Sequence, residues 1–145
     1  MHTCTLVERN ALRHPEAIAT EENGRQLAWG AFRENIARLA AGLSSAGVGP
    51  GDRVAVLAEN AAAYIELTYA TQWLGGVSVP INTRWTPEEV AFALADCGAG
   101  FLFIDGVGAD CCQRMDPERR GSVRLFAPNA EHGLPVGVEA SLADL

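Results

Sequence analysis

The sequence has no lysine, and all eleven of its basic residues are arginines that are spread along the 145-residue chain. Eighteen acidic residues outweigh them and give a net charge of −7. A surface that binds nucleic acid or an anionic membrane needs clustered cations, so this balance argues against both partners. The chain also lacks a run of about 20 apolar residues, so we expect no membrane-spanning helix. Its first residues lack the basic start and apolar core of a secretory signal, which predicts a cytoplasmic protein.

Motifs for metal binding and nucleophilic catalysis are also missing. Two of the four cysteines, Cys111 and Cys112, are adjacent, whereas zinc sites usually separate such a pair by two residues. Cys97 lies in an apolar helical pattern and is predicted to pack as a small hydrophobe. An even number of cysteines in a chain that looks intracellular does not imply disulfides. The three histidines lie far apart with no serine or cysteine motif beside them, so no catalytic residue is assigned.

The N-terminal third of the chain predicts two helices and a hairpin. Apolar residues in 5–13 fit a short helix. Asn23-Gly24 between two short apolar runs predicts a hairpin turn, because both residue types tolerate positive φ. Apolar residues at three- and four-residue steps over 30–46 predict a long helix with one buried face, including the aromatic ring of Phe32. Gly47 is expected just past its end.

A repeating strand-and-helix rhythm follows. Predicted strands centre near Val54, Val77, Phe101 and Val123, which lie 23, 24 and 22 residues apart. Helical patterns separate them, and this order indicates βαβ units with a parallel sheet. The strand cores are continuous apolar runs, as expected when helices cover both faces of a sheet. The predicted fold class is therefore α/β, with an N-terminal helix and a small hairpin followed by a parallel sheet with helices on both faces.

Thr86 starts the helix with the strongest local signal. Pro87 occupies the first helical position and Glu89 follows Thr86 by three residues. This spacing predicts a capping box, in which the threonine hydroxyl and the glutamate carboxylate each accept a hydrogen bond from a free backbone N–H. The helix between the first two strands, over 61–74, carries Tyr64, Tyr69 and Trp73, which we expect in the core rather than as a stacking platform.

The signal weakens after Asp105. Residues 116–122 read as a polar turn and 122–127 as an edge strand. Prolines and glycines in 127–138 predict a loop or linker, and residues 139–145 could begin a further helix. We therefore divide the chain into a partial domain over 1–126 and a linker with the start of a further segment over 127–145.

The glycine-rich segment 47–52 superficially resembles a phosphate-binding loop. Such a loop runs from a strand through glycines into a helix, so that free N–H groups at the helix start face the anion. Here the order is helix, glycine turn, strand, and we interpret the segment as a helix end followed by a tight turn.

Ligands of open parallel sheets bind beyond the carboxyl ends of the strands. The polar residues at these ends are Glu59 with Asn60, 82–85, Asp105 with Gly106, and 128–129. We expect Asn60 to cap the following helix. Glu59 and Asp105 are interpreted as solvated loop acids, which could coordinate Mg²⁺ only if a triphosphate were held nearby.

The run from Gly47 to Asp105 resembles the N-terminal part of the AMP-forming acyl-CoA synthetases, the adenylate-forming ligase superfamily. The matching pieces are GVGPGDRVAVLAEN, WLGGVSVPINTRWT and TPEEVAFALADCGAGFLFID, preceded by RQLAWGAFRENIARLAAGL. The resemblance covers about residues 5–105. It implies the opening part of a ligase that uses ATP, Mg²⁺ and CoA to convert a carboxylic acid, such as a fatty acid, into its CoA thioester.

The same resemblance assigns one binding residue. The arginine in this segment of several family members lies by the phosphate of the CoA nucleotide, which here is Arg84; a guanidinium grips a phosphate with two parallel N–H bonds. The alternative is an ion pair between Arg84 and Glu88. The family's Ser/Thr/Gly-rich ATP loop and catalytic lysine match positions beyond Leu145, so the chain alone is expected to bind none of these cofactors and to be inactive.

Three interpretations of the chain remain open. It could be a fragment of an acyl-CoA synthetase, a stand-alone binding or regulatory module that pairs with another chain, or a small nucleotide-binding domain only superficially like a ligase. A Ser/Thr/Gly-rich stretch followed by Pro-Lys after Leu145 would establish the first, and a stop codon would favour the second. Because sheet edges and helix faces of a partial domain stay uncovered, we also expect a homo-oligomer or association with the missing ligase segments.

Overall fold

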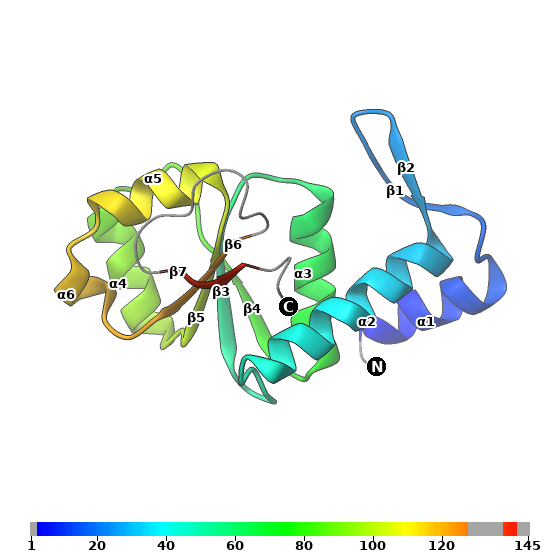
Figure 1. Ribbon diagram of the computed structural model, residues 1–145, viewed down its shortest axis with the longest axis horizontal. Helices are drawn as coiled ribbons and strands as arrows, with labels where there is room; N and C mark the ends of the chain where they lie inside the picture. The colour runs from blue at the N-terminus through cyan, green and yellow to red at the C-terminus, as the bar shows by residue number, and fades with distance from the viewer. Residues whose placement is uncertain (1–2, 128–137, 142–145) are drawn as a thin grey trace.

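A five-stranded parallel sheet with helices on both faces forms the body of the protein (Figure 1). The structure is a computed structural model and describes residues 3–127 and 138–141. The sheet order is β4-β3-β5-β6-β7, with every neighbouring pair parallel. Its strands are β3 (Arg53–Leu57), β4 (Val77–Pro80), β5 (Phe101–Ile104), β6 (Arg124–Ala127) and β7 (Val138–Ser141). The predicted α/β class is confirmed.

Two hydrophobic cores lie on opposite faces of this sheet. On one face α2 (Trp29–Ser45) and α3 (Ala62–Trp73) pack over β3, β5 and β6, and on the other face lie α4 (Pro87–Cys97) and α5 (Gly106–Arg114). Successive side chains of β3 alternate between the cores, with Val54 and Val56 in the first and Ala55 and Leu57 in the second. All four are buried, because a central parallel strand has no solvent face.

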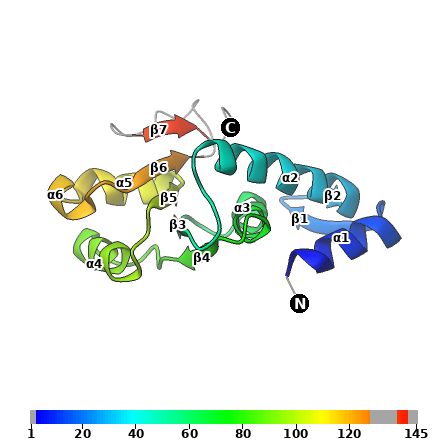
Figure 2. The same ribbon diagram turned by 90° about the horizontal axis from the view of Figure 1, so that it is seen from below.

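The N-terminal elements extend away from the sheet (Figures 1 and 2). They are α1 (Cys4–Arg13), which packs on α2, and the antiparallel hairpin of β1 (Ile18–Glu22) and β2 (Arg25–Ala28). Asn23 and Gly24 turn the hairpin with φ of 51° and 78°. The predicted helix, hairpin and long helix are confirmed.

An aromatic cluster joins α2 to α3 within the first core. Phe32 is buried and meets the rings of Trp29 and Tyr69 edge to face, each with centroids 5.8 Å away. Tyr64, Tyr69 and Trp73 are partly buried against this core, as predicted.

The C-terminal segment differs from three predictions. Residues 117–120 form a short helix, α6 (Pro117–Arg120), within the expected polar turn. β6 is not an edge strand, because β7 pairs with it in parallel. Residues 139–141 therefore belong to a strand rather than to a helix, since pairing with the open side of β6 outweighs the helix propensity of Glu139 and Ala140. The loop was expected over 127–138, but Ala127 ends β6 and Val138 begins β7. The rest of that loop, 128–137, and residues 142–145 lie outside the described residues.

Local signals at the helix ends agree with the sequence. The capping box is present: Glu89 N–H donates to the Thr86 hydroxyl (3.3 Å) and Thr86 N–H donates to the Glu89 carboxylate (2.8 Å). Gly47 follows α2 with φ 97°, and Gly49 N–H donates to the Asp52 carboxylate (2.8 Å), which closes the tight turn before β3. Among the described residues, no helix is long and apolar enough to cross a membrane.

Candidate functional site

The carboxyl ends of β3, β4 and β5 lie at one edge of the sheet, because parallel strands point the same way. Three segments leave this edge: residues 58–61 into α3, 81–86 into α4, and Asp105 directly into α5. Most of the polar residues that the sequence suggested for ligand binding lie in these three segments.

Asp105 ties two of these segments together. One carboxylate oxygen accepts from Gly108 N–H (2.9 Å) and caps α5, and the other accepts from Glu59 N–H (2.7 Å) at the end of β3. The interpretation of Asp105 as a solvated loop acid is therefore wrong. An aspartate directly before the first residue of a helix is a common N-cap, and that signal was present in the sequence. The side chain of Glu59 is exposed, so only its backbone takes part.

Gly108 lets the start of α5 approach β3 closely. A Cβ at this position would lie 2.1 Å from the carbonyl oxygen of Leu57. The first turn of α5 thus presses against the last residue of the central strand, and the Asp105 carboxylate accepts from its Gly108 N–H. An anion would have to displace Asp105 to use this helix start, so the position is structural.

Asn60 does not cap α3, which corrects the prediction. The N-cap residue is Ala61 in extended conformation, and no side chain accepts a hydrogen bond there. Asn60 is exposed and lines a shallow hollow of about 310 Å³ between the hairpin and the start of α3, together with Thr20 and Tyr64. Asn60 lies one residue before the N-cap position. The residue at that position, Ala61, has no side-chain acceptor for the free N–H groups of the helix.

Arg84 lies in a turn fixed at both ends. The Asn82 side chain accepts from Arg84 N–H (2.9 Å) and the Asn82 carbonyl accepts from Trp85 N–H (3.1 Å), and the capping box of Thr86 follows. Arg84 itself is exposed. Within 3–127 and 138–141 no ion pair joins it to Glu88, although that pairing was the alternative prediction. The turn therefore holds the backbone while the guanidinium faces solvent.

These strand-end groups do not assemble into a metal centre. Glu59 and Asp105 meet only through a backbone N–H, and across the described part of the chain no three His, Cys, Asp or Glu side chains group as metal ligands. The four cysteines are not joined in disulfides, and Cys111 and Cys112 are buried. Burial raises the pKa of the Cys111 thiol. The charge of Arg114 lowers this pKa and that of Glu88 raises it, each by less than burial does. The thiol therefore stays protonated and is a poor nucleophile.

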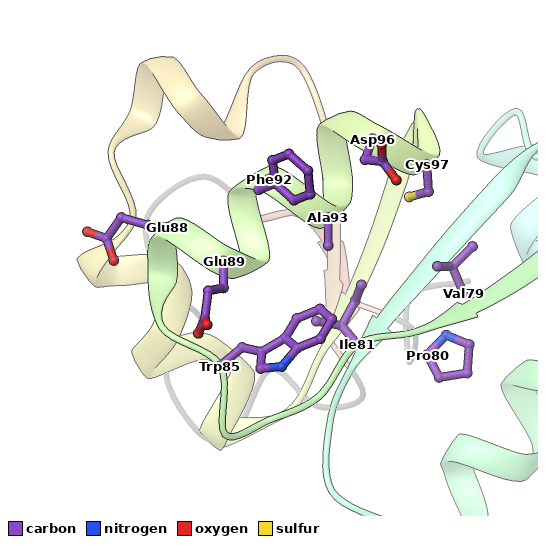
Figure 3. Close-up of a pocket in the computed structure, with 10 residues that line it drawn as sticks. All are labelled: Val79, Pro80, Ile81, Trp85, Glu88, Glu89, Phe92, Ala93, Asp96 and Cys97. Atoms are coloured by element: carbon purple, nitrogen blue, oxygen red, sulfur yellow. The ribbon is translucent and has the colours of Figure 1, made fainter.

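A groove between α4 and β4 was not predicted. Its volume is about 610 Å³. Trp85, Ile81 and Ala93 lie around it, beside the edge strand β4 (Figure 3). Phe92 on its rim is 71% exposed and Trp85 is 41% exposed. The sequence predicted this helix and its capping box, and it did not show that the side chain of Phe92 reaches solvent.

Comparisons with known proteins agree on one family. The family model described as AMP-binding enzyme matches residues 7–136. A feruloyl-CoA synthase of Amycolatopsis sp is 45% identical over 94 residues, which are 65% of this chain and 19% of that protein. A 2-succinylbenzoate–CoA ligase of Geobacillus sp. (strain WCH70) is 31% identical over 130 residues, 90% of this chain and 25% of that protein. The chain thus spans about a fifth to a quarter of the curated relatives' length.

Solved structures show the same fold. A Mycobacterium tuberculosis fatty acyl CoA synthetase superposes with a TM-score of 0.79 at 28% identity, over 85% of this chain and 25% of that chain. The N-terminal domain of FACL13 from the same organism gives a TM-score of 0.81 at 27% identity, over 88% of this chain and 33% of that chain.

Proposed function

The chain belongs to the AMP-binding enzyme family, and we propose that it supplies the N-terminal region of an AMP-forming ligase that joins a carboxylic acid to CoA. The observation that carries the proposal is the match of the family model over 7–136, together with relatives that are CoA ligases. In the family reaction the carboxylate attacks the α-phosphate of ATP and pyrophosphate leaves. The CoA thiol then attacks the acyl carbon and AMP leaves. We further propose that the carboxylic acid is fatty or aromatic and that the ligase is cytoplasmic.

The described residues do not fit the triphosphate of ATP or its Mg²⁺. Asp105 already accepts from the Gly108 N–H at the start of α5, and no metal-ligating cluster is found within these residues. The sequence also has no lysine to neutralise phosphate charge. Adenylation is dominated by charge stabilisation on the phosphates, so this chain by itself is expected to be inactive. Its role is to provide the sheet and the strand-end turns on which a complete site is built.

Pyrophosphate exchange into ATP tests the inactivity. The purified chain, given a panel of fatty and aromatic acids, should show no exchange above a preparation from cells with an empty vector. Turnover clearly above that background would contradict the assignment of the phosphate-binding groups to other segments.

Arg84 is the residue we propose for CoA. Its exposure and its place in a fixed turn leave the guanidinium available to a nucleotide phosphate. The test is a chimera in which residues 7–136 replace the corresponding residues of the Amycolatopsis feruloyl-CoA synthase. Arg84→Ala should raise KM for CoA by about tenfold, the loss of one charge-assisted contact, and leave pyrophosphate exchange unchanged. Arg25→Ala, an exposed arginine in the hairpin, is the matched control. Equal KM values for Arg84→Ala and Arg25→Ala would contradict the role.

Association with missing ligase segments or with a second copy is also part of the proposal. Leu12 at the end of α1 is 85% exposed, Ile18 in the hairpin is 52% exposed and Ile65 on α3 is 43% exposed. A contiguous exposed apolar patch marks an interaction site, and we propose that these side chains contribute to one. Light scattering after size exclusion at tens of micromolar should give a mass above that of one chain, and a clean monomer with a cooperative thermal transition would refute the expectation.

A further inference from the structure

The groove between α4 and β4, called the α4 groove below, combines apolar and acidic side chains. Its apolar part is formed by Ile81, Trp85 and Phe92, and three carboxylates, those of Glu88, Glu89 and Asp96, line the same hollow. None of the described residues that line it is basic. Figure 3 shows that the acidic side chains all come from α4, while the opposite wall comes from the end of β4.

An added β-strand does not suit this edge of the sheet. β4 pairs with β3 through Val77 N–H, which donates to the Asp52 carbonyl, and Ile81 N–H, which donates to the Val56 carbonyl. Alternate residues of a strand point their backbone groups to opposite sides, so Ser78 and Pro80 face outward. Pro80 has no N–H to donate, and such a proline blunts an edge strand. An occupant must therefore bind through side chains.

A second copy of the same groove is also a poor occupant. Glu88, Phe92 and Asp96 follow one another at four-residue steps, so they share one face of α4. A symmetric dimer through this face would bring the carboxylates of the two copies together, and opposed like charges disfavour association. The charge complement of this face is a cationic surface with an apolar centre.

We propose that the α4 groove docks an amphipathic helical segment of a partner protein, in which an apolar side chain lies between two arginine or lysine residues. Glu88 and Asp96 are eight positions apart, which at about 1.5 Å per residue is about 12 Å along α4. The two cations of the partner should be separated by a similar distance, about two helical turns. The apolar residue enters beside Trp85 and Phe92, and the cations pair with the carboxylates at either end, as in other recognition of a helix by a groove.

The capping box makes this surface rigid. Thr86 and Glu89 fix the start of α4 through two reciprocal hydrogen bonds, directly after Trp85. A partner therefore meets a preformed groove and loses little free energy in ordering it.

The test uses the 145-residue chain and a fluorescent synthetic peptide of about 15 residues, the length at which isolated helices begin to persist. The peptide carries one leucine with an arginine four positions on either side, and a second peptide has glutamate in place of each arginine. Phe92→Ala removes an exposed ring, so it should leave the thermal transition unchanged. Asp96→Arg reverses one carboxylate, and Glu34→Arg makes the same charge change at an exposed position of α2, on the other face of the sheet.

Fluorescence anisotropy should show that the arginine peptide binds and the glutamate peptide does not. Phe92→Ala and Asp96→Arg should each raise Kd by about tenfold or more, and Glu34→Arg by no more than about twofold. The proposal is overturned if neither peptide binds, if both bind alike, or if Glu34→Arg weakens binding as much as Asp96→Arg. A dimer in light scattering that Phe92→Ala dissociates would instead assign the groove to a second copy and overturn it too.

Discussion

Substitution of Gly108 by alanine probes the contact between α5 and the central strand. The added Cβ would lie 2.1 Å from the Leu57 carbonyl oxygen and 2.9 Å from the Cβ of Ile104. Leu57 is paired with Ile104 across β3 and β5, so neither neighbour can retreat without disturbing the sheet. α5 must therefore shift by about 1 Å, and overpacking of this kind costs about 1–3 kcal/mol.

Gly106 is the matched control, because it lies two residues earlier in the same helix. A Cβ at Gly106 meets no atom within 4 Å. Alanine is a better helix former than glycine by up to about 1 kcal/mol, so Gly106→Ala should be neutral or slightly stabilising. The same propensity offsets part of the clash at Gly108, which leaves a net loss of about 1–2 kcal/mol for Gly108→Ala.

Urea unfolding of the two variants and the parent chain measures the difference. The midpoint for Gly108→Ala should fall at an unchanged slope, and that for Gly106→Ala should stay level or rise. In a thermal melt the loss corresponds to about 2–8 °C. Equal midpoints for the two variants would show that the start of α5 does not pack closely against the Leu57 carbonyl.

Three further outcomes follow from the same geometry. Thr86→Ala should lower the free energy of unfolding by about 1 kcal/mol through loss of the cap, whereas Thr86→Ser keeps the hydroxyl and most of that energy; indistinguishable denaturant midpoints for the parent and Thr86→Ala would show that the capping box contributes nothing. Asp105→Ala should cost about 1–3 kcal/mol, because it leaves the N–H groups of Glu59 and Gly108 without their acceptor, and equal stability in urea would argue that water replaces the carboxylate. Cys111 should react with iodoacetamide at pH 8 far more slowly in the native chain than in urea, because burial raises its pKa and keeps the thiol protonated; equal rates by mass spectrometry would contradict its burial.

Elements with a strong local pattern could be predicted from the sequence. The apolar period of α2 and the Asn23-Gly24 turn each have a cause within a few residues, and both appear as expected. The capping box likewise depends only on residues three apart. The parallel strands β3, β4 and β5 followed from the spacing of the apolar runs. Their order was not predicted, because β5 pairs with β3 rather than with β4, its predecessor in the chain.

The features that could not be predicted from the sequence depend on contacts between residues that are distant in the chain. β7 forms because β6 offers an open side, and nothing within 138–141 indicates this. The bond from Glu59 N–H to Asp105 spans 46 positions, so the local sequence could indicate the N-cap role of Asp105 but not its contact with the end of β3. The α4 groove exists because Phe92 lies outside the core, which a helical pattern does not specify on its own.

The chimera described above tests the central claim most directly. Residues 7–136 of this chain, placed in the Amycolatopsis feruloyl-CoA synthase, should support formation of feruloyl-CoA from ferulate, ATP and CoA. If the segment is the N-terminal region of a CoA ligase, kcat/KM should stay within about a hundredfold of the parent enzyme, a loss of up to about 2.7 kcal/mol at the graft boundaries. A chimera that is folded, with a cooperative thermal transition, yet forms no feruloyl-CoA would contradict the claim.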